Sequence, residues 1–472
     1  MADTSLSNIV EDNMGKSEKT VSFSQSEPLA AGGIKGLERL SGDWERLLPP
    51  EQYYSPEFAQ LERERFWKKV WVVAGRIEDL EEPGDYFTFQ LADQSLLIVR
   101  TESDKLQAYY NVCQHRGNKL VADGEGSLPG GFTCAFHSWK WNLDGSLREI
   151  TDRETFRPEV LCGNLDLAEV RCEVWGGFVF VCQSPDAPPV HEFLSGAREH
   201  AEPYRLENLR VITDIELDLP ANWKTGVDAF IETYHLHAIH PQMADSMDDV
   251  NMQTELYDYG MSMTQHPFTT ISPRKSDQET LTEAQRAMLG EVGLDPVEFE
   301  GRALEVREAI QQAKRALKEA AKLHLDNFTD DQLTDDQAIF FFPNLAFNAH
   351  PEGALFMQFL PHERDTERMI FRIQILIHPM EQDQAHLIPL YMGIPRGADV
   401  SCKEKPEKLY ALPPAEVSPL GEVLGQDVDL LDTVQKGLHS NGFKGMRLSQ
   451  QEVRVRHFHD EFERYMNNEK PW

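Results

Sequence analysis

Two short segments of the chain each combine one cysteine with one histidine. The segment 111–120 reads NVCQHRGNKL, and the segment 134–141 reads CAFHSWKW, so the pattern is Cys-x-His in the first and Cys-x-x-His in the second. The four residues are Cys113, His115, Cys134 and His137. A zinc finger usually groups its two cysteines in one half and its two histidines in the other. Because each segment here contains one cysteine and one histidine, the pattern favours a different kind of metal site.

A two-iron, two-sulfur cluster of the Rieske type fits the mixed halves. In such a cluster two cysteines hold one iron and two histidines hold the other. Two loops that each supply one thiolate and one imidazole can hold it from both sides. Gly117, Gly130 and Gly131 favour tight loops at these positions. The pattern predicts a Rieske [2Fe-2S] cluster, and a zinc-binding interaction protein is the competing interpretation.

A second group of metal-ligand side chains lies in residues 222–241, which read NWKTGVDAFIETYHLHAIHP. On one continuous helix, Asp228, Glu232 and His235 would share a face. Pro241 marks the end of the helical run. Two histidines and one carboxylate form the ligand set of a non-haem iron that activates oxygen, with positions left open for O₂ and substrate.

The spacing alone leaves open which histidines would hold this iron. His237 and His240 share a helical face, whereas His235 and His240 require the helix to bulge or end between them. A histidine cluster on an amphipathic segment is often structural, but its presence beside a cluster motif favours an iron site.

The elements that must position these residues fall into four segments. Residues 1–45 are predicted to be a flexible tail. Residues 46–71 form a helical lead-in, in which Ser55-Pro56-Glu57 has the sequence of a helix start. Short apolar runs between turn residues predict a small all-β domain over 72–185. Residues 186–472 then form a larger domain that carries the second site.

Alternating apolar residues predict strands within the larger domain. Ile215, Leu217 and Leu219 alternate with polar residues, and so do Phe371, Ile373, Ile375 and Ile377. Charged and apolar residues at helical spacing predict a helical insertion over about 277–326, with a solvated face. The aromatic run 338–351 is expected in a core strand, although its phenylalanines Phe340, Phe342 and Phe347 are alternatively candidates for a pocket wall.

The composition narrows the class of protein. The chain has 472 residues and a formal net charge of −33, which disfavours binding to nucleic acid or to an anionic membrane surface. No run of about 20 apolar residues suggests a membrane helix. The first residues lack the apolar core of a signal peptide, so we expect a cytoplasmic protein. The cysteines outside the motif are expected to be buried apolar residues rather than a disulfide framework. They are Cys162, Cys172, Cys182 and Cys402.

Together the two motifs resemble the large (alpha, terminal oxygenase) subunit of the Rieske non-haem iron oxygenases, the aromatic ring-hydroxylating family, over about residues 50–465. The resemblance implies an α+β fold: a small all-β Rieske domain and a catalytic domain with an antiparallel sheet surrounded by helices, of the helix-grip type. It implies one [2Fe-2S] cluster and one mononuclear Fe(II). It also implies that His235 and His240 hold the iron and that His237 does not.

The resemblance assigns roles to three acidic positions. Glu232 falls on the carboxylate that links the iron site to a cluster ligand of the neighbouring subunit, and Asp228 on a second polar position near the iron. The third iron ligand should be an acid in 424–438, LGQDVDLLDTVQKGL. Asp427 best matches the family's offset to Gln435, and Asp429 and Asp432 are the alternatives.

The resemblance implies a terminal oxygenase that uses O₂ and electrons from a separate NAD(P)H-dependent reductase, a ferredoxin, or both. It would hydroxylate or cis-dihydroxylate an aromatic or other small apolar substrate. The implied assembly is a head-to-tail homotrimer, with or without a small beta subunit. Glu232 stands where many ring dihydroxylases carry Asp, which raises the alternative of a monooxygenase or demethylase acting on a quaternary amine. A Rieske electron-transfer protein without oxygen chemistry is a further alternative.

Two surface or helix features complete the expectations. Arg116, Lys119 and Lys140 flank the cluster motif, and we hypothesise that they form a basic collar that docks an acidic redox partner. Ordinary solvated side chains are the competing interpretation. His457 and His459 lie in a C-terminal helical pattern and are expected to be structural rather than ligands.

Overall fold

The computed structural model describes residues 33–42, 45–321, 325–388, 392–394, 397–414, 416–470 and 472. Most of the predicted flexible tail, 1–45, lies outside these residues. Its described part differs from the prediction, because strand β1 (Ile34–Lys35) pairs in parallel with strand β13 (Gln253–Leu256). A second contact holds the same stretch, since the backbone N–H of Ser41 donates to Asp460 at 2.8 Å.

The helical lead-in begins where the sequence predicts. Helix α1 (Pro56–Arg65) has Ser55 as its N-cap, and the Ser55 hydroxyl accepts a hydrogen bond from the backbone N–H of Phe58 at 3.2 Å. Pro56 occupies the first turn, where its missing N–H costs nothing. A short 3₁₀ turn, η3 (Pro50–Tyr53), precedes the helix.

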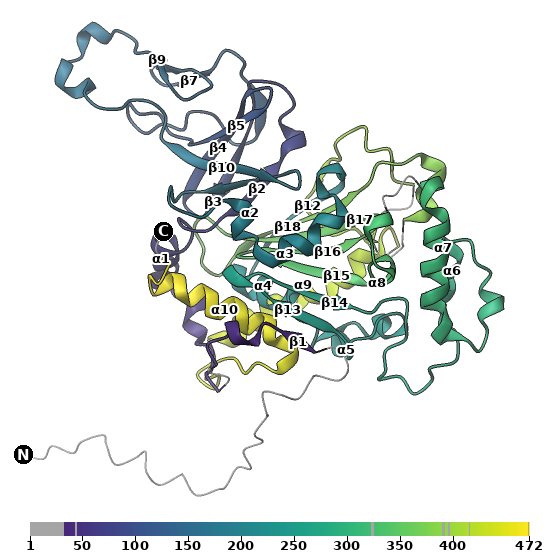
Figure 1. Cartoon of the computed structure of the whole chain (residues 1–472). Coiled ribbons are helices and arrows are strands. Elements are labelled where there is room, and N and C mark those ends of the chain that lie inside the picture. The colour runs from purple at the N-terminus through teal and green to yellow at the C-terminus, as the bar shows by residue number, and fades with distance from the viewer. Residues whose placement is uncertain are drawn as a thin grey trace, which may run out of the picture.

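Residues 72–182 form a β-domain that projects from the rest of the molecule (Figure 1). Among the described residues it has a seven-stranded sheet in the order β2-β11-β10-β5-β4-β3-β6 and a three-stranded sheet β7-β8-β9. The strands are β2 (Val72–Arg76), β3 (Asp85–Leu91), β4 (Gln94–Glu102), β5 (Lys105–Tyr110), β6 (Glu125–Ser127), β7 (Phe132–Thr133), β8 (Lys140–Trp141), β9 (Leu147–Glu149), β10 (Glu169–Trp175) and β11 (Phe178–Cys182). The three-stranded sheet lies at the outer end of the projection (Figure 1).

The larger body is built on a sheet with nine strands in the described residues, in the order β1-β13-β14-β15-β16-β17-β18-β12-β19. The neighbours are antiparallel except at the two edges, where β1 and β19 pair in parallel. The remaining strands are β12 (Arg210–Leu219), β14 (Ser262–His266), β15 (Asp336–Phe341), β16 (Leu345–His350), β17 (Gly353–Pro361), β18 (Met369–Ile377) and β19 (Lys408–Leu409). The two alternating runs seen in the sequence become β12 and β18, which pair with Ile215 opposite Ile373.

The two faces of this sheet have different neighbours, because successive strand residues point to opposite sides. Phe356 contacts Phe178 of the β-domain with ring centroids 4.7 Å apart, and Gln358 donates to the Val73 carbonyl. On the other face, Phe359 packs against Phe230 at 5.3 Å. The β-domain therefore covers one face, and helices cover the face that carries the second predicted site.

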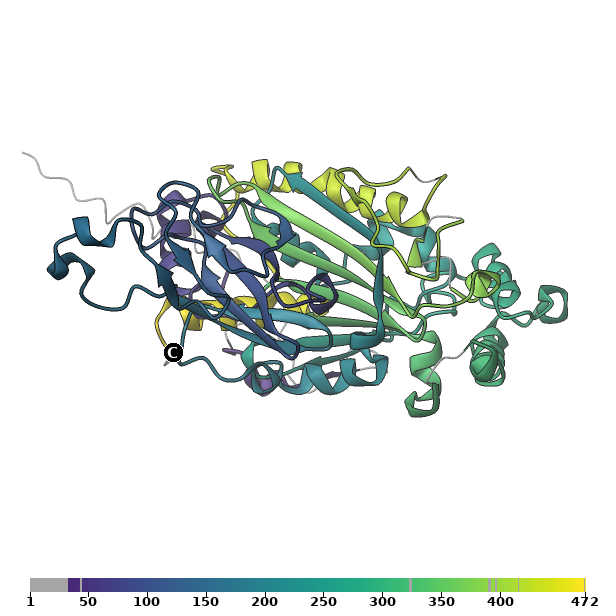
Figure 2. The same cartoon turned by 90° about the horizontal axis from the view of Figure 1, so that it is seen from above.

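The helices that surround the sheet are α2 (Val190–Phe193), α3 (Ser195–Ala201), α4 (Trp223–Phe230), α5 (Leu236–Ile239), α6 (Glu283–Glu291), α7 (Val306–Ala321), α8 (Asp330–Thr334), α9 (Pro419–Leu438) and α10 (Val453–Met466). Helices α6 and α7 fall within the predicted insertion, 277–326, and project at the end of the larger body away from the β-domain (Figures 1 and 2). The mixed architecture of helices and antiparallel sheets confirms the predicted α+β class. In the described part of the chain, no helix is both long and apolar enough to cross a membrane.

Candidate functional site

The four residues of the first motif lie in two adjoining loops of the β-domain. The backbone N–H of Cys113 donates to the Asn118 carbonyl at 2.8 Å, and that of Cys134 donates to the Trp139 carbonyl at 2.9 Å. Each loop is thereby closed on itself, with its cysteine buried. The rings of His115 and His137 approach to a centroid distance of 4.5 Å. The fold thus brings the two imidazoles together from separate loops.

The surroundings of these residues fit an iron–sulfur cluster. The Cys113 thiol hydrogen-bonds Cys134, so the two sulfurs are neighbours as well. Burial alone would raise the pKa of the Cys134 thiol, but the backbone N–H groups of Phe136 and His137 lower it more, which favours the thiolate. The Nδ1 atom of His115 is buried without a hydrogen-bond partner. Paired thiolates and an imidazole nitrogen left free for a ligand match the donor set of a [2Fe-2S] cluster.

Trp139 supports this loop pair through its ring. It stacks on His115 with centroids 4.9 Å apart and an interplanar angle of 7°. Phe156 packs against both rings, at 5.9 Å from His115 and 5.7 Å from Trp139. Trp139 is therefore a packing residue of this loop pair, and its stacking fixes the plane of the candidate ligand His115.

The second motif does not form the single helix that the sequence predicts over 222–241. Helix α4 ends at Phe230, and the short helix α5 starts at Leu236. Between them, one carboxylate oxygen of Glu232 accepts hydrogen bonds from the backbone N–H groups of Tyr234 and His235. A side chain that takes these donors competes with helical hydrogen bonding and begins a new turn. The Glu232 carboxylate therefore stabilises the break between the two helices.

The break places the two histidines at opposite ends of α5. His235 is the N-cap residue of that helix and His240 is its C-cap residue. Their rings lie 5.3 Å apart between centroids. His237 is exposed, with its ring 6.1 Å from that of Tyr234. The structure therefore brings together the outer pair of histidines, His235 and His240, and leaves His237 apart from them.

Helix α9 brings an acid to this pair. The Oδ1 atom of Asp427 lies 3.0 Å from Nε2 of His240 and 3.7 Å from Nε2 of His235. One ligand atom from each of these residues lies within 4.8 Å of the others. Asp429 is exposed, and Asp432 pairs with Lys436. Of the three acids considered from the sequence, Asp427 is the one that meets the histidines.

A hydrogen bond on the Nδ1 atom of each histidine fixes the orientation of its ring. His235 Nδ1 donates to Glu232 Oε1 at 2.6 Å, and His240 Nδ1 donates to Gln426 Oε1 at 2.7 Å. Each ring therefore turns its Nε2 atom toward Asp427. Metal-binding histidines commonly have such a partner on the second nitrogen, which fixes the tautomer. Two imidazole nitrogens and one carboxylate suit a mononuclear non-haem iron.

Asp228 lies outside this arrangement. Its two carboxylate oxygens accept from the Tyr53 hydroxyl at 2.6 Å and from His459 Nε2 at 2.8 Å. These partners join α4 to η3 and α10. The side chain does not line the cavity at the histidines. His459, expected to be structural, has a structural partner in Asp228, and His457 donates to the Tyr257 carbonyl at 2.8 Å.

A cavity of about 370 Å³ opens beside His235, His240 and Asp427. Its wall is largely apolar and includes Phe230, Met243, Met247, Phe268, Met288 and Met357. The phenylalanines considered as wall residues lie elsewhere in core strands or beside them. Phe340 and Phe342 pack on Phe458, and Phe347 stacks on Phe356. Their core interpretation, which the sequence favours, agrees with these contacts.

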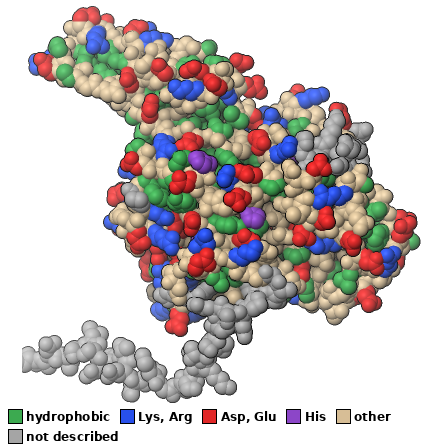
Figure 3. Space-filling view, viewed as in Figure 1, with side chains coloured by type: hydrophobic (Ala, Val, Ile, Leu, Met, Phe, Trp, Pro, Cys, Tyr) green, Lys and Arg blue, Asp and Glu red, His purple; other side chains and the backbone are tan. Residues whose placement is uncertain are grey.

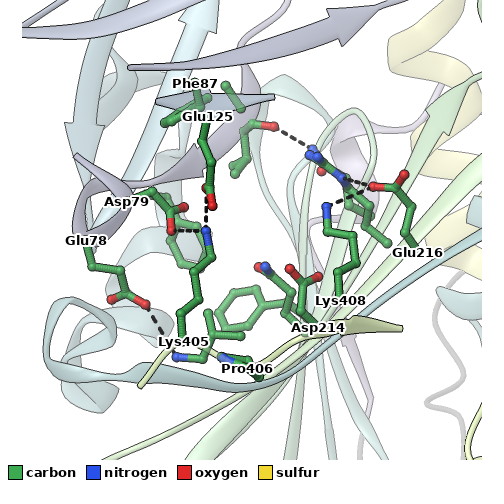
Figure 4. Close-up of a pocket in the computed structure, with 18 of the residues that line it drawn as sticks. Glu78, Asp79, Phe87, Glu125, Asp214, Glu216, Lys405, Pro406 and Lys408 are labelled. Atoms are coloured by element: carbon green, nitrogen blue, oxygen red, sulfur yellow. Dashed lines mark hydrogen bonds and ion pairs between the residues drawn. The ribbon is translucent and has the colours of Figure 1, made fainter. Parts of the chain in front are cut away.

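A larger cavity of about 1040 Å³ lies between the β-domain and the larger sheet, and Figure 4 shows its charged side chains. Lys405 Nζ is 2.7 Å from both Asp79 and Glu125 of the β-domain. Glu216 pairs with Arg372 and Lys408 at 3.2 Å each. These groups neutralise one another and tie residues 405–408 to both bodies.

The basic collar considered around the cluster loops is weakened by acidic neighbours. Lys119 pairs with Asp123 at 2.7 Å, and Lys140 pairs with Glu149 at 2.7 Å. Arg116 packs over the exposed Phe136 ring at 5.4 Å. Acidic and basic side chains alternate over the projecting domain (Figure 3). The solvated-surface interpretation therefore fits the lysines better than a docking collar does.

Comparisons with protein families match two parts of the chain. A model described as "Rieske [2Fe-2S] domain" matches residues 70–165, and one described as "Ring hydroxylating alpha subunit (catalytic domain)" matches residues 206–468. The first range contains all four residues of the cluster motif. The second contains His235, His240 and Asp427.

Similar curated proteins include two oxygenase subunits. The carnitine monooxygenase oxygenase subunit of Acinetobacter baumannii is 30% identical over 245 residues, which cover 49% of this chain and 64% of that protein. The glycine betaine monooxygenase oxygenase subunit of Chromohalobacter salexigens is 28% identical over 224 residues, 47% of this chain and 49% of that protein. The matched part thus spans about half to two thirds of the length of these relatives.

Solved structures with a similar fold cover most of the chain. The quaternary ammonium Rieske monooxygenase CntA in complex with L-carnitine matches with a TM-score of 0.60 and 22% identity, over 89% of this chain and 95% of that one. Naphthalene 1,2-dioxygenase with bound indole matches with a TM-score of 0.62 and 18% identity, over 89% and 91%. At these identities the likeness is one of fold.

Proposed function

Because this chain belongs to the ring-hydroxylating alpha-subunit family, we propose that it is a terminal oxygenase that inserts oxygen from O₂ into a small organic substrate. Its electrons would come from a separate NAD(P)H-dependent reductase, a ferredoxin, or both. The observation that carries the proposal is the meeting of His235, His240 and Asp427 within 4.8 Å beside a cavity. A Rieske electron-transfer protein would have no use for that second site.

The residues divide between two cofactors. Cys113, His115, Cys134 and His137 would hold a [2Fe-2S] cluster, and His235, His240 and Asp427 would hold one iron ion. When bound, these groups supply one-electron transfer and O₂ activation, respectively. Glu232 and Gln426 hold the imidazoles in the tautomer that presents Nε2. The apolar wall of the cavity excludes bulk water and positions the substrate against the open side.

The separation of the two sites supports an assembly of several chains. The three-stranded sheet beside the cluster loops lies at the far end of the β-domain, and α5 lies on the opposite side of the larger body (Figure 1). Three chains arranged head to tail would bring the 134–137 loop of one near Glu232 of the next. The proposed assembly is thus a homotrimer, and a small beta subunit remains compatible with it. Analytical ultracentrifugation of the loaded protein tests this point, and a monomer would contradict it.

Two substrate classes compete within this function. Monooxygenation of a quaternary amine is supported by the names of the carnitine and glycine betaine relatives and by Glu232 in place of the aspartate of many ring dihydroxylases. Hydroxylation of an aromatic substrate is supported by the apolar wall with Phe230 and Phe268. We favour the quaternary amine.

The decisive experiment is turnover under ¹⁸O₂ with a surrogate reductase. Panels of quaternary amines and of aromatic hydrocarbons are offered, and the products are analysed by mass spectrometry. One labelled oxygen in a product of the first panel is expected. Two labelled oxygens in a diol of the second panel would support dihydroxylation instead. No labelled product from either panel, with both metal sites loaded, would contradict the proposed function.

A further inference from the structure

The floor of the site cavity is polar, in contrast to its wall. Asp336 of β15 accepts hydrogen bonds from Asn348 at 2.8 and 3.0 Å and from His266 Nδ1 at 3.1 Å. His350 Nε2 lies 3.3 Å from its other oxygen. All four residues line the cavity, and all but Asn348 are almost fully buried. The carboxylate of Asp336 is therefore fully engaged by its own neighbours.

Among the described residues, one guanidinium, that of Arg454, borders the same cavity. It belongs to the first turn of α10 and is 4% exposed. Its Nε donates to the Ser262 hydroxyl at 3.0 Å. Among the described residues, no carboxylate lies within ion-pair distance of it. Burial lowers the pKa of Arg454 to about 9, which reflects the cost of holding this charge away from water.

The position of Arg454 in its helix gives it no local electrostatic support. The N-terminal turn of a helix carries partial positive charge from its free N–H groups, so a cation there is disfavoured. Asp336 acts on it electrostatically but is already engaged by two imidazoles and an amide. A buried charge of this kind is normally compensated by a hydrogen-bonded partner of opposite sign. The missing partner would have to come from the cavity.

We propose that Arg454 binds an anionic group of the substrate, a carboxylate, while the reacting end of the same molecule lies at His235, His240 and Asp427. The inference rests on the proposed function and narrows its substrate class to a carboxylate-bearing molecule. His266 supports the polar end, since its Nε2 is buried without a partner and its ring is held by Asp336. The apolar wall between the two ends suits the alkyl portion of such a molecule.

Binding of matched ligand pairs tests the proposal without turnover. γ-Butyrobetaine, butyrate and benzoate are each compared with their primary amides by calorimetry on the metal-loaded protein without O₂. At least one carboxylate is expected to bind about 10- to 100-fold more tightly than its amide, because a charge-assisted hydrogen bond is lost in the amide. Equal affinities across all three pairs, or no binding at all, would overturn the proposal.

Substitutions then test whether Arg454 is the source of the preference for the carboxylate. Arg454→Met is expected to abolish the preference for the carboxylate, and Arg454→Lys to keep part of it. Arg456→Met is the matched control, since Arg456 is buried two residues along in α10, donates to the Arg46 carbonyl and does not line the cavity. If Arg454→Met fails to fold, Arg454→Lys and Ser262→Ala, which frees the guanidinium, must each weaken the preference. An unchanged preference in any folded Arg454 variant contradicts the assignment.

The outcomes separate this inference from the proposed function. Labelled product from a substrate without an anionic group, together with equal carboxylate and amide affinities, would retain the oxygenase and remove the role of Arg454. Carboxylate binding that depends on Arg454, with no labelled product from any substrate, would retain the anion site and remove the oxygenase.

Discussion

Glu232 Oε1 lies 2.6 Å from His235 Nδ1, and the other oxygen of the same carboxylate accepts from the backbone N–H of that histidine at 3.3 Å. One side chain thus sets both the start of α5 and the rotation of the imidazole at that start. The family likeness implies that Glu232 links the iron site to a neighbouring subunit. Within one chain, the contacts of Glu232 already orient His235 so that its Nε2 atom faces Asp427.

Glu232→Gln should weaken binding of iron at the second site. An amide cannot accept the imidazole N–H and both backbone N–H groups as a carboxylate does, so the orientation of His235 is lost. Loss of such a partner commonly costs about 10- to 100-fold in metal affinity. Titration of the apo protein with Fe(II) measures it. Glu283→Gln, at a side chain that is 94% exposed, is the control, and equal affinities in the two variants would contradict this role.

Asp427→Ala should remove the mononuclear iron and leave the cluster in place. The variant keeps both histidines but loses the carboxylate that lies 3.0 Å from His240. The measured iron content is expected to fall by about one iron per chain, while the visible absorption of the cluster is unchanged. Asp432→Ala, on the same helix but paired with Lys436, should retain full iron content. A full iron content in Asp427→Ala would show that another group completes the site.

Cys134→Ser should abolish the [2Fe-2S] cluster. Cys134 is buried at the start of its loop, hydrogen-bonded to Cys113, and among the described residues no other thiol lies where it could replace it. Cys162 is exposed, so the expectation that it is buried is wrong. Cys162→Ser is therefore the matched control and should keep normal absorption and electron paramagnetic resonance signals. Retention of acid-labile sulfide in Cys134→Ser would exclude the proposed ligand set.

Glu62→Gln should destabilise the fold rather than alter chemistry. Glu62 is 3% exposed, pairs with the buried Lys224 and accepts from the Trp223 indole at 3.1 Å. Removing one partner of a buried ion pair leaves an uncompensated charge and costs about 3–5 kcal/mol. Urea unfolding measures this cost. Glu64→Gln, at a neighbouring position on the same helix outside the buried pair, should change the free energy of unfolding by less than about 1 kcal/mol.

His457 should make stability depend on pH. Burial lowers its pKa from the usual 6.5 to about 4, with smaller effects from the Tyr257 carbonyl, Asp460 and Arg464. Between these two pH values the unfolded chain binds more protons than the folded one, so the free energy of unfolding falls as the pH is lowered. The contribution of this group between pH 7 and pH 4 is about 3 kcal/mol.

The measurement compares urea unfolding of the protein and of His457→Gln across that range. Glutamine can still donate to the Tyr257 carbonyl but does not titrate, so the variant should lose less stability on acidification. His439→Gln, at a half-exposed histidine paired with Glu367, should follow the parent protein. Parallel curves for the parent and His457→Gln would contradict the assignment.

The residues close together in sequence were the predictable part of both sites. Cys113 with His115, and Cys134 with His137, carry their ligand spacing in the sequence, and so does the histidine cluster at 235–240. Asp427 was reachable through its offset to Gln435. The break between α4 and α5 was not, because periodicity reports which face a residue would occupy but not that Glu232 captures the N–H groups of the next turn.

The polar floor of the cavity had no sequence signal. His266, Asp336, Asn348 and Arg454 come from β14, β15, β16 and α10, and their contacts depend on strand register. His266 stands opposite Asp336 only because β14 and β15 pair as they do. The pairing of Lys119 and Lys140 with acids is likewise a tertiary result. Ligand residues that lie in local motifs can therefore be predicted from the sequence. Residues that set substrate specificity come from separate elements, and only the fold brings them together.

The two-residue strands at the edges of the larger sheet have a consequence for handling the protein. β1 adds a parallel partner to β13 and β19 adds one to β12, so these two strands do not present bare backbone N–H and C=O groups along their whole length. An uncovered sheet edge is a template for pairing with another chain. A recombinant protein that begins after residue 40 would lack β1, and the edge of β13 would be exposed. We expect that protein to aggregate during purification.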